Sequence, residues 1–127
     1  MKSLVIIDDE ALLARGISTM LEKEGLDYQV TGPAGDGLTG LSLIREKNPD
    51  VASLDIRMPG MDGLELIEKA KKEFPELVFV IISGYKKFEY ARKGLELGVC
   101  AYLDKPVTRG KLRSALKAAE EAMGKNT

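Results

Sequence analysis

Acidic and basic side chains that could handle phosphate and a metal ion follow several short apolar runs of this sequence. Asp8 and Asp9 come directly after one run, Asp55 after another, and Lys105 shortly after a third. If the carboxylates lie together, each like-charged pair at 4 Å costs about 4 kcal/mol at an effective dielectric constant of 20. A Mg²⁺ ion offsets that repulsion best, since it takes carboxylate, carbonyl and phosphate oxygens as ligands. The lysine could then neutralise a phosphate group as a flexible point charge.

Alternating strands and helices are expected to bring these side chains together. Short runs rich in Val and Ile, each followed by an amphipathic stretch, predict five repeats of a strand and a helix. The predicted strands are Leu4–Ile7, Tyr28–Thr31, Val51–Leu54, Val78–Ile82 and Val99–Leu103. Near-continuous apolar strands of this kind are typical of a parallel sheet covered on both faces.

Three of the helical stretches carry an apolar stripe at a spacing of three or four residues. The stripes are Leu13, Ile17, Met20 and Leu21; Leu64, Ile67 and Ala70; and Leu112, Leu116, Ala119 and Met123. Gly25, Gly98 and Gly124 mark the expected helix ends. The expected fold class is α/β, a doubly wound five-stranded parallel sheet of order 2-1-3-4-5, with the first helix on one face and the later ones on the other. Function is expected in the crevice beyond the carboxyl ends of the strands.

The length and composition describe one domain over residues 1–127. The chain is 44% hydrophobic and 31% charged, and its apolar runs are far shorter than the roughly 20 residues of a membrane span. We see no signal peptide in the first residues, so no contact with a membrane is expected. The single cysteine, Cys100, cannot form an intrachain disulfide, and a reducing, cytoplasmic location is the expectation.

Charge is unevenly distributed, although the net charge is only −1. Residues 86–117 contain nine basic and three acidic side chains. They could form a nucleic-acid patch or simply solvated helix faces. The second interpretation is favoured, because interleaved aromatic residues and a recognisable binding motif are missing.

Four motifs in the chain resemble, by their order, the receiver domain of two-component response regulators. They are Ile7-Asp8-Asp9-Glu10, Asp55 to Gly63, Ile82-Ser83-Gly84-Tyr85 and Tyr102-Leu103-Asp104-Lys105-Pro106. The resemblance covers the chain from about Leu4 to Met123. It implies a flavodoxin-like receiver fold with five helices, acting as a phosphorylation-dependent signalling switch. It implies no enzyme in the usual sense, because the domain catalyses only its own phosphorylation and dephosphorylation.

The resemblance also implies roles for the site residues. Asp55 would be the phosphoacceptor, a carboxylate nucleophile that takes a phosphoryl group from the phosphohistidine of a sensor histidine kinase. Asp8, Asp9, Asp55 and the backbone carbonyl of Arg57 would bind Mg²⁺. Lys105 would contact a phosphoryl oxygen, and its peptide bond to the following proline is typically cis in this family.

The implied switch depends on two further residues. Ser83 would hydrogen-bond the phosphoryl group, and the ring of Tyr102 would rotate into the space that Ser83 vacates. This would rearrange the surface of the fourth helix, fifth strand and fifth helix, which we expect to form a phosphorylation-dependent homodimer or to dock an output domain. Arg57 and Tyr85 flank the path of an attacking water in this family, so both are expected to slow hydrolysis of the phosphorylated state.

The run from Ser83 to Ala91 resembles receivers whose output is an AraC-type DNA-binding domain. We find no such output domain in residues 1–127, so DNA would be contacted only indirectly, and the expected output is transcription.

Purely structural roles for these residues, and other functions for the domain, stay open beside the resemblance. Taken singly, Asp8 and Asp9 could cap a helix, and Asp55 could belong to a plain turn. Gly35 to Gly40 is a literal G-x-G-x-x-G match that could cradle a dinucleotide, although it follows a strand expected at the edge of the sheet. A Mg²⁺-dependent phosphatase or phosphotransferase and a pure interaction domain are the other rivals. The chain contains no histidine, which excludes a histidine general base.

Overall fold

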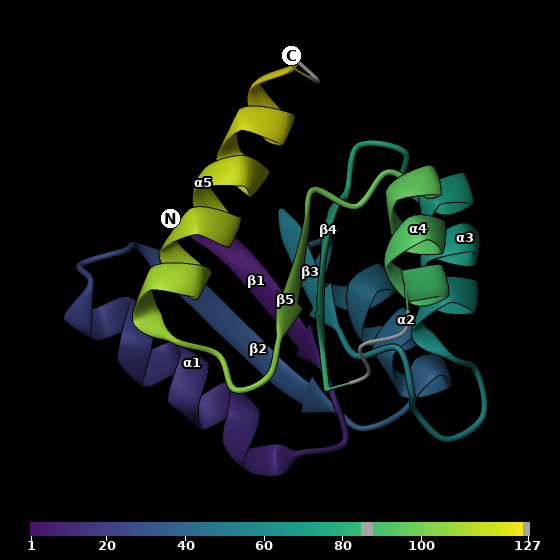
Figure 1. Ribbon diagram of the computed structural model, residues 1–127, viewed down its shortest axis with the longest axis horizontal. Helices are drawn as coiled ribbons and strands as arrows, with labels where there is room; N and C mark the ends of the chain where they lie inside the picture. The colour runs from purple at the N-terminus through teal and green to yellow at the C-terminus, as the bar shows by residue number, and fades with distance from the viewer. Residues whose placement is uncertain (85–87, 126–127) are drawn as a thin grey trace.

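The computed structural model describes residues 1–84 and 88–125, and within them five strands alternate with five helices (Figure 1). The strands are β1 (Lys2–Ile7), β2 (Tyr28–Ala34), β3 (Val51–Leu54), β4 (Val78–Ser83) and β5 (Ala101–Asp104). The helices are α1 (Ala11–Lys23), α2 (Gly37–Lys47), α3 (Gly63–Glu73), α4 (Phe88–Glu96) and α5 (Arg109–Lys125). Tyr85, Lys86 and Lys87 lie outside the described residues.

The strands form one parallel sheet in the order β2-β1-β3-β4-β5, which confirms the expected topology. The direction in which successive strands are added to the sheet reverses at β1. The chain first moves to β2 at one edge and then crosses back to β3 on the other side of β1. Because each crossover is right-handed, α1 and α2 must lie on opposite faces. The carboxyl ends of β1 and β3 therefore flank an open crevice.

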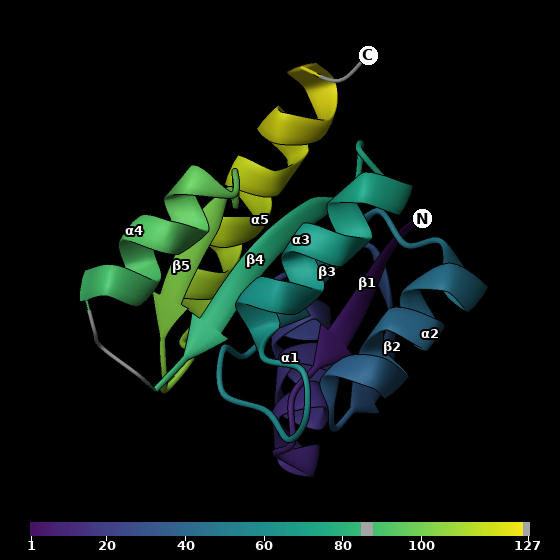
Figure 2. The ribbon, with the colours of Figure 1, turned by 90° about the vertical axis from the view of Figure 1, so that its right-hand side faces the viewer.

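Helices cover both faces of the sheet (Figures 1 and 2), with α1 and α5 on one and α2, α3 and α4 on the other. One core contains the stripes of α1 and α5, including Ile17, Leu21 and Leu116. The other contains those of α2 and α3, including Ile44 and Ile67, with α4 packed beside them. The expectation that every helix after the first shares one face is wrong for α5. No strand follows α5, so the handedness rule does not constrain it, and it covers apolar sheet surface that α1 leaves open.

The predicted apolar stripes are the buried faces of their helices. Gly25 and Gly98 end α1 and α4 with backbone φ angles of +67° and +83°, which favour glycine. The prediction that Gly124 stops a helix is wrong, because α5 continues to Lys125.

Strand limits differ from the predictions mainly at the ends. The Val51–Leu54 prediction is confirmed, whereas β1 begins earlier and β2 continues to Ala34 across a shift in its register with β1. At the other edge β5 begins at Ala101, later than predicted. Val99 is buried, but its N–H donates to the carbonyl of Gly94 at 3.1 Å. Its apolar character therefore serves the end of α4 and not strand pairing.

The register of β1 and β3 positions the acids. Ile7 and Leu54 are direct partners at the end of this ladder, and both are essentially buried. Asp8 and Asp55, the residues that follow them, consequently leave the sheet side by side. The N–H of Asp55 donates to the carbonyl of Ile7 at 3.0 Å, which extends the pairing up to the acid itself.

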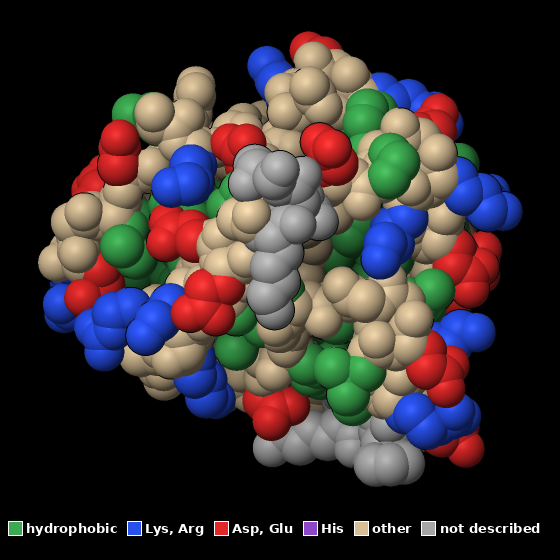
Figure 3. All heavy atoms as spheres, turned by 90° about the horizontal axis from the view of Figure 1, so that it is seen from above, with side chains coloured by type: hydrophobic (Ala, Val, Ile, Leu, Met, Phe, Trp, Pro, Cys, Tyr) green, Lys and Arg blue, Asp and Glu red, His purple; other side chains and the backbone are tan. Residues whose placement is uncertain are grey.

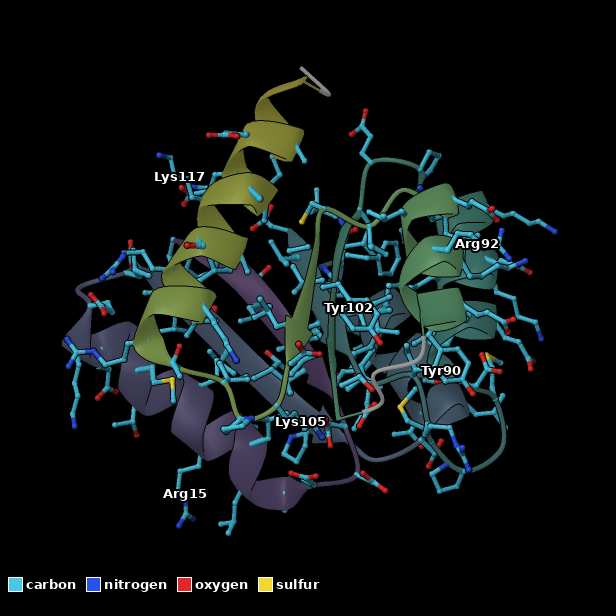
Figure 4. All side chains as sticks on the ribbon, in the orientation of Figure 1. Arg15, Tyr90, Arg92, Tyr102, Lys105 and Lys117 are labelled. Carbon is cyan, nitrogen blue, oxygen red and sulfur yellow. The ribbon has the colours of Figure 1, made fainter. Side chains whose placement is uncertain are left out.

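Several basic side chains of the C-terminal half form ion pairs. Arg109 and Arg113 on α5 each lie 3.0 Å from the carboxylate of Glu24 at the end of α1, and the hydrogen bond from Arg109 is the main reason that the pKa of Glu24 is lowered. Arg92 pairs with an acid one turn further along α4 at 2.7 Å. Arg92 and Lys117 point outward from different helices (Figure 4). These contacts agree with solvated helix faces.

Figure 3 views the molecule from above, so that the amino ends of the strands face the reader, and shows acidic and basic side chains interspersed over that face. None of the helices within residues 1–84 and 88–125 has the length and apolar character that crossing a bilayer requires.

Lys71 links α3 to the end of α4. Its ammonium group is partly buried and donates to the backbone carbonyl of Leu97, beside Gly98. A cation at the C-terminus of a helix also complements the helix dipole. We expect Lys71→Met to lower the free energy of unfolding by about 1–2 kcal/mol, because a carbonyl loses a charged donor. Urea denaturation measures this loss, and Lys72→Met, an exposed lysine of the same helix, is the matched control. Equal effects of the two substitutions would contradict the assignment.

Candidate functional site

Three carboxylates meet at the carboxyl edge of the sheet. One oxygen from each of Asp8, Asp9 and Asp55 lies within 4.8 Å of the others. Asp8 and Asp55 are buried, with 2% and 6% of their surfaces exposed, whereas Asp9 is exposed. The structure thus brings together the three acids that the sequence singled out from the ends of two different strands.

The ammonium group of Lys105 lies inside this acid cluster. Its Nζ is 2.9 Å from Asp8 Oδ2, 3.0 Å from Asp55 Oδ2 and 3.1 Å from Glu10 Oε1. Burial by itself would lower the pKa of Lys105, but the contacts with the three carboxylates outweigh burial and raise that pKa. The peptide bond from Lys105 to Pro106 is cis, in agreement with the resemblance. Lys105 lies at the lower end of β5 in Figure 4, on the same edge as the acids.

Burial makes the charged form of the Asp8 carboxylate unfavourable. Its Oδ1 accepts a hydrogen bond from the backbone N–H of Glu10 at 2.8 Å, a turn contact and not a cap of the first turn of α1. Its Oδ2 is buried and is paired with the Lys105 ammonium 2.9 Å away. Burial raises the pKa of this carboxyl above its ordinary value of 3.8.

The residues present fit a Mg²⁺ ion. The carboxylate oxygens of Asp8, Asp9 and Asp55 lie within 4.8 Å of one another, include a buried oxygen of Asp8, and are the hard oxygen ligands that this cation prefers. Beside the acids lies an open hollow of about 410 Å³, lined by Asp9, Glu10, Asp55, Arg57, Met58 and Pro59. Its polar walls leave room for phosphate and for water molecules on the metal.

Asp8→Asn is expected to stabilise the metal-free protein at pH 7 by about 0.5–2 kcal/mol, the usual gain when a functional but unfavourable group is removed. Because the folded-state pKa is raised, the carboxyl contributes stability only while it is protonated, and this contribution is lost as the pH rises through the folded-state pKa. The gain from the substitution should therefore shrink as the pH falls towards 3.8. Thermal melts in EDTA at several pH values measure it, and a gain that does not change with pH would contradict the cause.

Arg57 contributes its backbone at the site. Its N–H donates to Asp55 Oδ1 at 3.4 Å, a long contact that helps to orient the carboxylate, and the residue lines the polar hollow. Metal binding by its backbone carbonyl stays a prediction, and the predicted shielding role of Tyr85 falls outside the described residues.

Ser83 and Tyr102 are in contact across two neighbouring strands. Ser83 is fully buried at the end of β4, and its hydroxyl is hydrogen-bonded to that of Tyr102 on β5. Burial raises the pKa of Tyr102, while the hydrogen bond with Ser83 opposes that rise. The Tyr102 ring lies between β5 and α4, on the same side as Tyr90 (Figure 4), and packs against the core beneath α4. The two residues assigned to the switch are thus already joined before any modification.

The glycine-rich run after β2 has a packing role. It follows the edge strand, and α2 opens at Gly37. A Cβ on Gly37 would lie 2.6 Å from the Met61 side chain, and one on Gly40 would lie 2.7 Å from Ile7. Asp36 caps α2 by accepting from the N–H of Thr39 at 2.8 Å. These contacts account for Gly37 and Gly40 without a dinucleotide.

Two residues at the site received no role from the sequence. Glu10 was visible only as the acid after Asp8 and Asp9, and its contact with Lys105 joins positions 95 residues apart. Gly63 opens α3, where a Cβ would overlap the backbone carbonyl of Asp55. A glycine directly after the helix-capping Asp62 was the available signal for such a close approach.

Comparison with known proteins agrees with this architecture. The sequence profile of the response regulator receiver domain matches residues 4–117. The chain is 36% identical over 117 residues to the uncharacterised transcriptional regulatory protein YesN of Bacillus subtilis. The aligned region covers 92% of this chain and 32% of that protein. It is 40% identical over 110 residues to protein-glutamate methylesterase/protein-glutamine glutaminase 2 of Nitratidesulfovibrio vulgaris, covering 86% and 30%. The chain therefore spans about a third of the length of these relatives.

A solved structure extends the similarity to the whole fold. The CheY-like response regulator receiver domain protein of Methanospirillum hungatei JF-1 superposes with a TM-score of 0.86 at 30% identity, covering 100% of this chain and 99% of the other. A doubly wound parallel sheet with acids and a lysine at its carboxyl edge agrees with the fold of these proteins. This chain belongs to the response regulator receiver domain family. It is the receiver domain of a two-component response regulator.

Proposed function

We propose that this domain is switched by phosphorylation of Asp55. The observation that carries the proposal is the Asp55 carboxylate itself, buried at the end of β3, with Lys105 Nζ 3.0 Å from its Oδ2 and two further acids beside it. An Asp55 oxygen would attack the phosphorus of a phosphohistidine, so that an O–P bond forms and the N–P bond breaks. The phosphohistidine ring, protonated on its other nitrogen, takes the electrons of the N–P bond and leaves with the kinase as a neutral imidazole.

The neighbouring residues bind and orient the reacting groups. Asp8, Asp9, Asp55 and the Arg57 carbonyl would hold Mg²⁺, which when bound supplies positive charge to the phosphoryl oxygens. Lys105 would donate to one phosphoryl oxygen, and the Arg57 N–H would keep the carboxylate oriented. The reaction is confined to the domain's own modification and its hydrolysis.

Intact mass after incubation with acetyl phosphate tests the proposal. We expect the wild-type protein to gain one phosphoryl group in Mg²⁺ and none in EDTA. Asp55→Asn should gain none under either condition, because an amide does not act as the nucleophile. A wild-type protein that remains unmodified in Mg²⁺ would favour a pure interaction domain, and turnover of external phosphate esters would favour a phosphatase.

The output would be carried by the face formed by α4, β5 and α5. A phosphoryl group on Asp55 would compete with Tyr102 for the hydroxyl of Ser83, and loss of that hydrogen bond would free the Tyr102 ring to repack against α4. The hydrogen bond that already joins the two residues supports this coupling. We infer a phosphorylation-dependent homodimer on this face or contact with an output domain.

A transcriptional output is supported by the Bacillus subtilis relative YesN, a transcriptional regulatory protein. DNA would then be bound by another domain of the regulator. Sedimentation of phosphorylated and unphosphorylated protein tests the homodimer, and identical profiles would leave output-domain contact as the alternative.

A further inference from the structure

Glu10 closes a ring of contacts between the acid cluster and the lysine. Its backbone N–H donates to Asp8 Oδ1 at 2.8 Å, and its side-chain Oε1 lies 3.1 Å from Lys105 Nζ. The same ammonium lies 2.9 Å from Asp8 Oδ2. Because the backbone of Glu10 is tied to Asp8, its carboxylate is held near the lysine, although its side chain is 62% exposed.

The Lys105 ammonium contacts carboxylate oxygens that a divalent cation could take as ligands. Two of its three anionic neighbours, Asp8 and Asp55, belong to the carboxylate group that fits a metal ion. Two cations cannot share the same carboxylate oxygens without strong repulsion. A metal ion that takes Asp8 Oδ2 or Asp55 Oδ2 as a ligand must therefore displace the ammonium from that oxygen.

The third neighbour differs from the other two. Glu10 lies outside the group of carboxylates that meet within 4.8 Å, and it borders both the polar hollow and a second hollow lined by α1 and by Lys105. An ammonium displaced from Asp8 and Asp55 can keep Glu10 as its anionic partner. It then remains beside the acid cluster, near enough to Asp55 to reach a phosphoryl group there, without contacting the oxygens that bind the metal.

We propose that Glu10 is a positioning residue that retains the Lys105 ammonium at the outer side of the acid cluster and so leaves Asp8 and Asp55 to the divalent cation. The inference rests on the proposed function, in which these acids hold Mg²⁺. It assigns to Glu10 a role that is separate from metal ligation and from the reaction at Asp55.

A double-mutant cycle on Mg²⁺ binding tests this role. Isothermal titration calorimetry would measure Kd for the wild-type protein, Glu10→Gln, Lys105→Met and the double variant. We expect Glu10→Gln to weaken Mg²⁺ binding by about two- to fivefold, the range that a partly exposed ion pair can supply. In the Lys105→Met background the same substitution should have clearly less effect, because no ammonium remains to compete.

The cycle separates positioning from general charge. If Glu10 merely attracts cations, its loss weakens Mg²⁺ binding by the same factor in both backgrounds, and that result overturns the inference. No change, or tighter binding, in the wild-type background overturns it as well. Thermal melts check that each variant is folded, and Lys105→Gln is a second neutral background if the methionine variant is not.

A second readout does not involve the metal. In EDTA, the ¹⁵Nζ resonance of Lys105 should shift in Glu10→Gln, since one of three anionic neighbours is lost, and an unchanged resonance overturns the inference. The titrations contain no phosphodonor. Equal effects in both backgrounds would therefore reject the role of Glu10 alone, whereas failure of Asp55 to accept a phosphoryl group would reject the proposed function.

Discussion

Lys105→Met should slow phosphorylation by acetyl phosphate by about 100-fold, the usual cost of losing one charged donor aimed at a reacting oxygen. The ammonium lies 3.0 Å from Asp55 Oδ2, so it is placed to neutralise charge on the phosphoryl group as that group reaches the carboxylate. The same substitution removes a cation from between Asp8 and Asp55. Mg²⁺ should therefore bind more tightly to the variant that reacts more slowly.

A slower reaction together with tighter Mg²⁺ binding distinguishes the predicted role of Lys105 from a general loss of structure. The rate is measured by intact mass against time at saturating Mg²⁺, and the affinity by calorimetry without the phosphodonor. Lys117→Met is the matched control, because Lys117 points outward from α5 away from the site (Figure 4). A rate equal to that of the control would show that the ammonium does not assist the transfer, and weaker Mg²⁺ binding would contradict the competition.

Gly63→Ala is expected to lower the free energy of unfolding by about 1–3 kcal/mol, the range found for overpacked cores. A Cβ at Gly63 would overlap the carbonyl oxygen of Asp55 and lie 2.8 Å from Leu54 Cδ1. The start of α3 is tied down by a hydrogen bond from the Gly63 N–H to the carbonyl of Ile56 at 2.8 Å. The backbone at Asp55 must therefore shift, and phosphorylation should slow together with the loss of stability.

Gly110→Ala supplies the matched comparison. Gly110 also lies at the beginning of a helix, α5, but a Cβ there would meet nothing within 4 Å. Alanine at this position should leave stability unchanged or raise it by up to about 1 kcal/mol, because it restricts the unfolded chain. Urea denaturation of both variants measures the contrast. Similar effects of the two substitutions on stability would show that the close contact of α3 with the Asp55 backbone does not require glycine at position 63.

The topology of this domain was predictable because its sequence signals are local and repeated. The apolar run Val51–Leu54 is buried along its whole length, so composition alone indicated a central strand. The sequence signal for a strand was weaker where a residue is buried without taking part in strand pairing. Val99 is buried at the end of α4 and does not begin β5, and the position of α5 depends on which face of the sheet needs cover.

The site was predictable to the level of its acids and its lysine. Asp8, Asp55 and Lys105 each follow an apolar strand, and parallel strands bring their carboxyl ends to one edge. The contact of Glu10 with Lys105 had no local signal, since it depends on how α1 and the segment after β5 approach each other. The joined hydroxyls of Ser83 and Tyr102 depend in the same way on side-chain conformations in the folded core.

By itself the sequence determined the order of the strands, the edge at which function lies and the residue types that gather there. Hydrophobic periodicity and crossover handedness suffice for this, because neither depends on the detailed contacts between side chains. Only the tertiary structure decided the distances. Burial removes water from Asp8 and Asp55, and it places the Lys105 ammonium where it contacts three carboxylates at once. Those energies depend on separations of a few ångströms between distant parts of the chain, which no local pattern encodes.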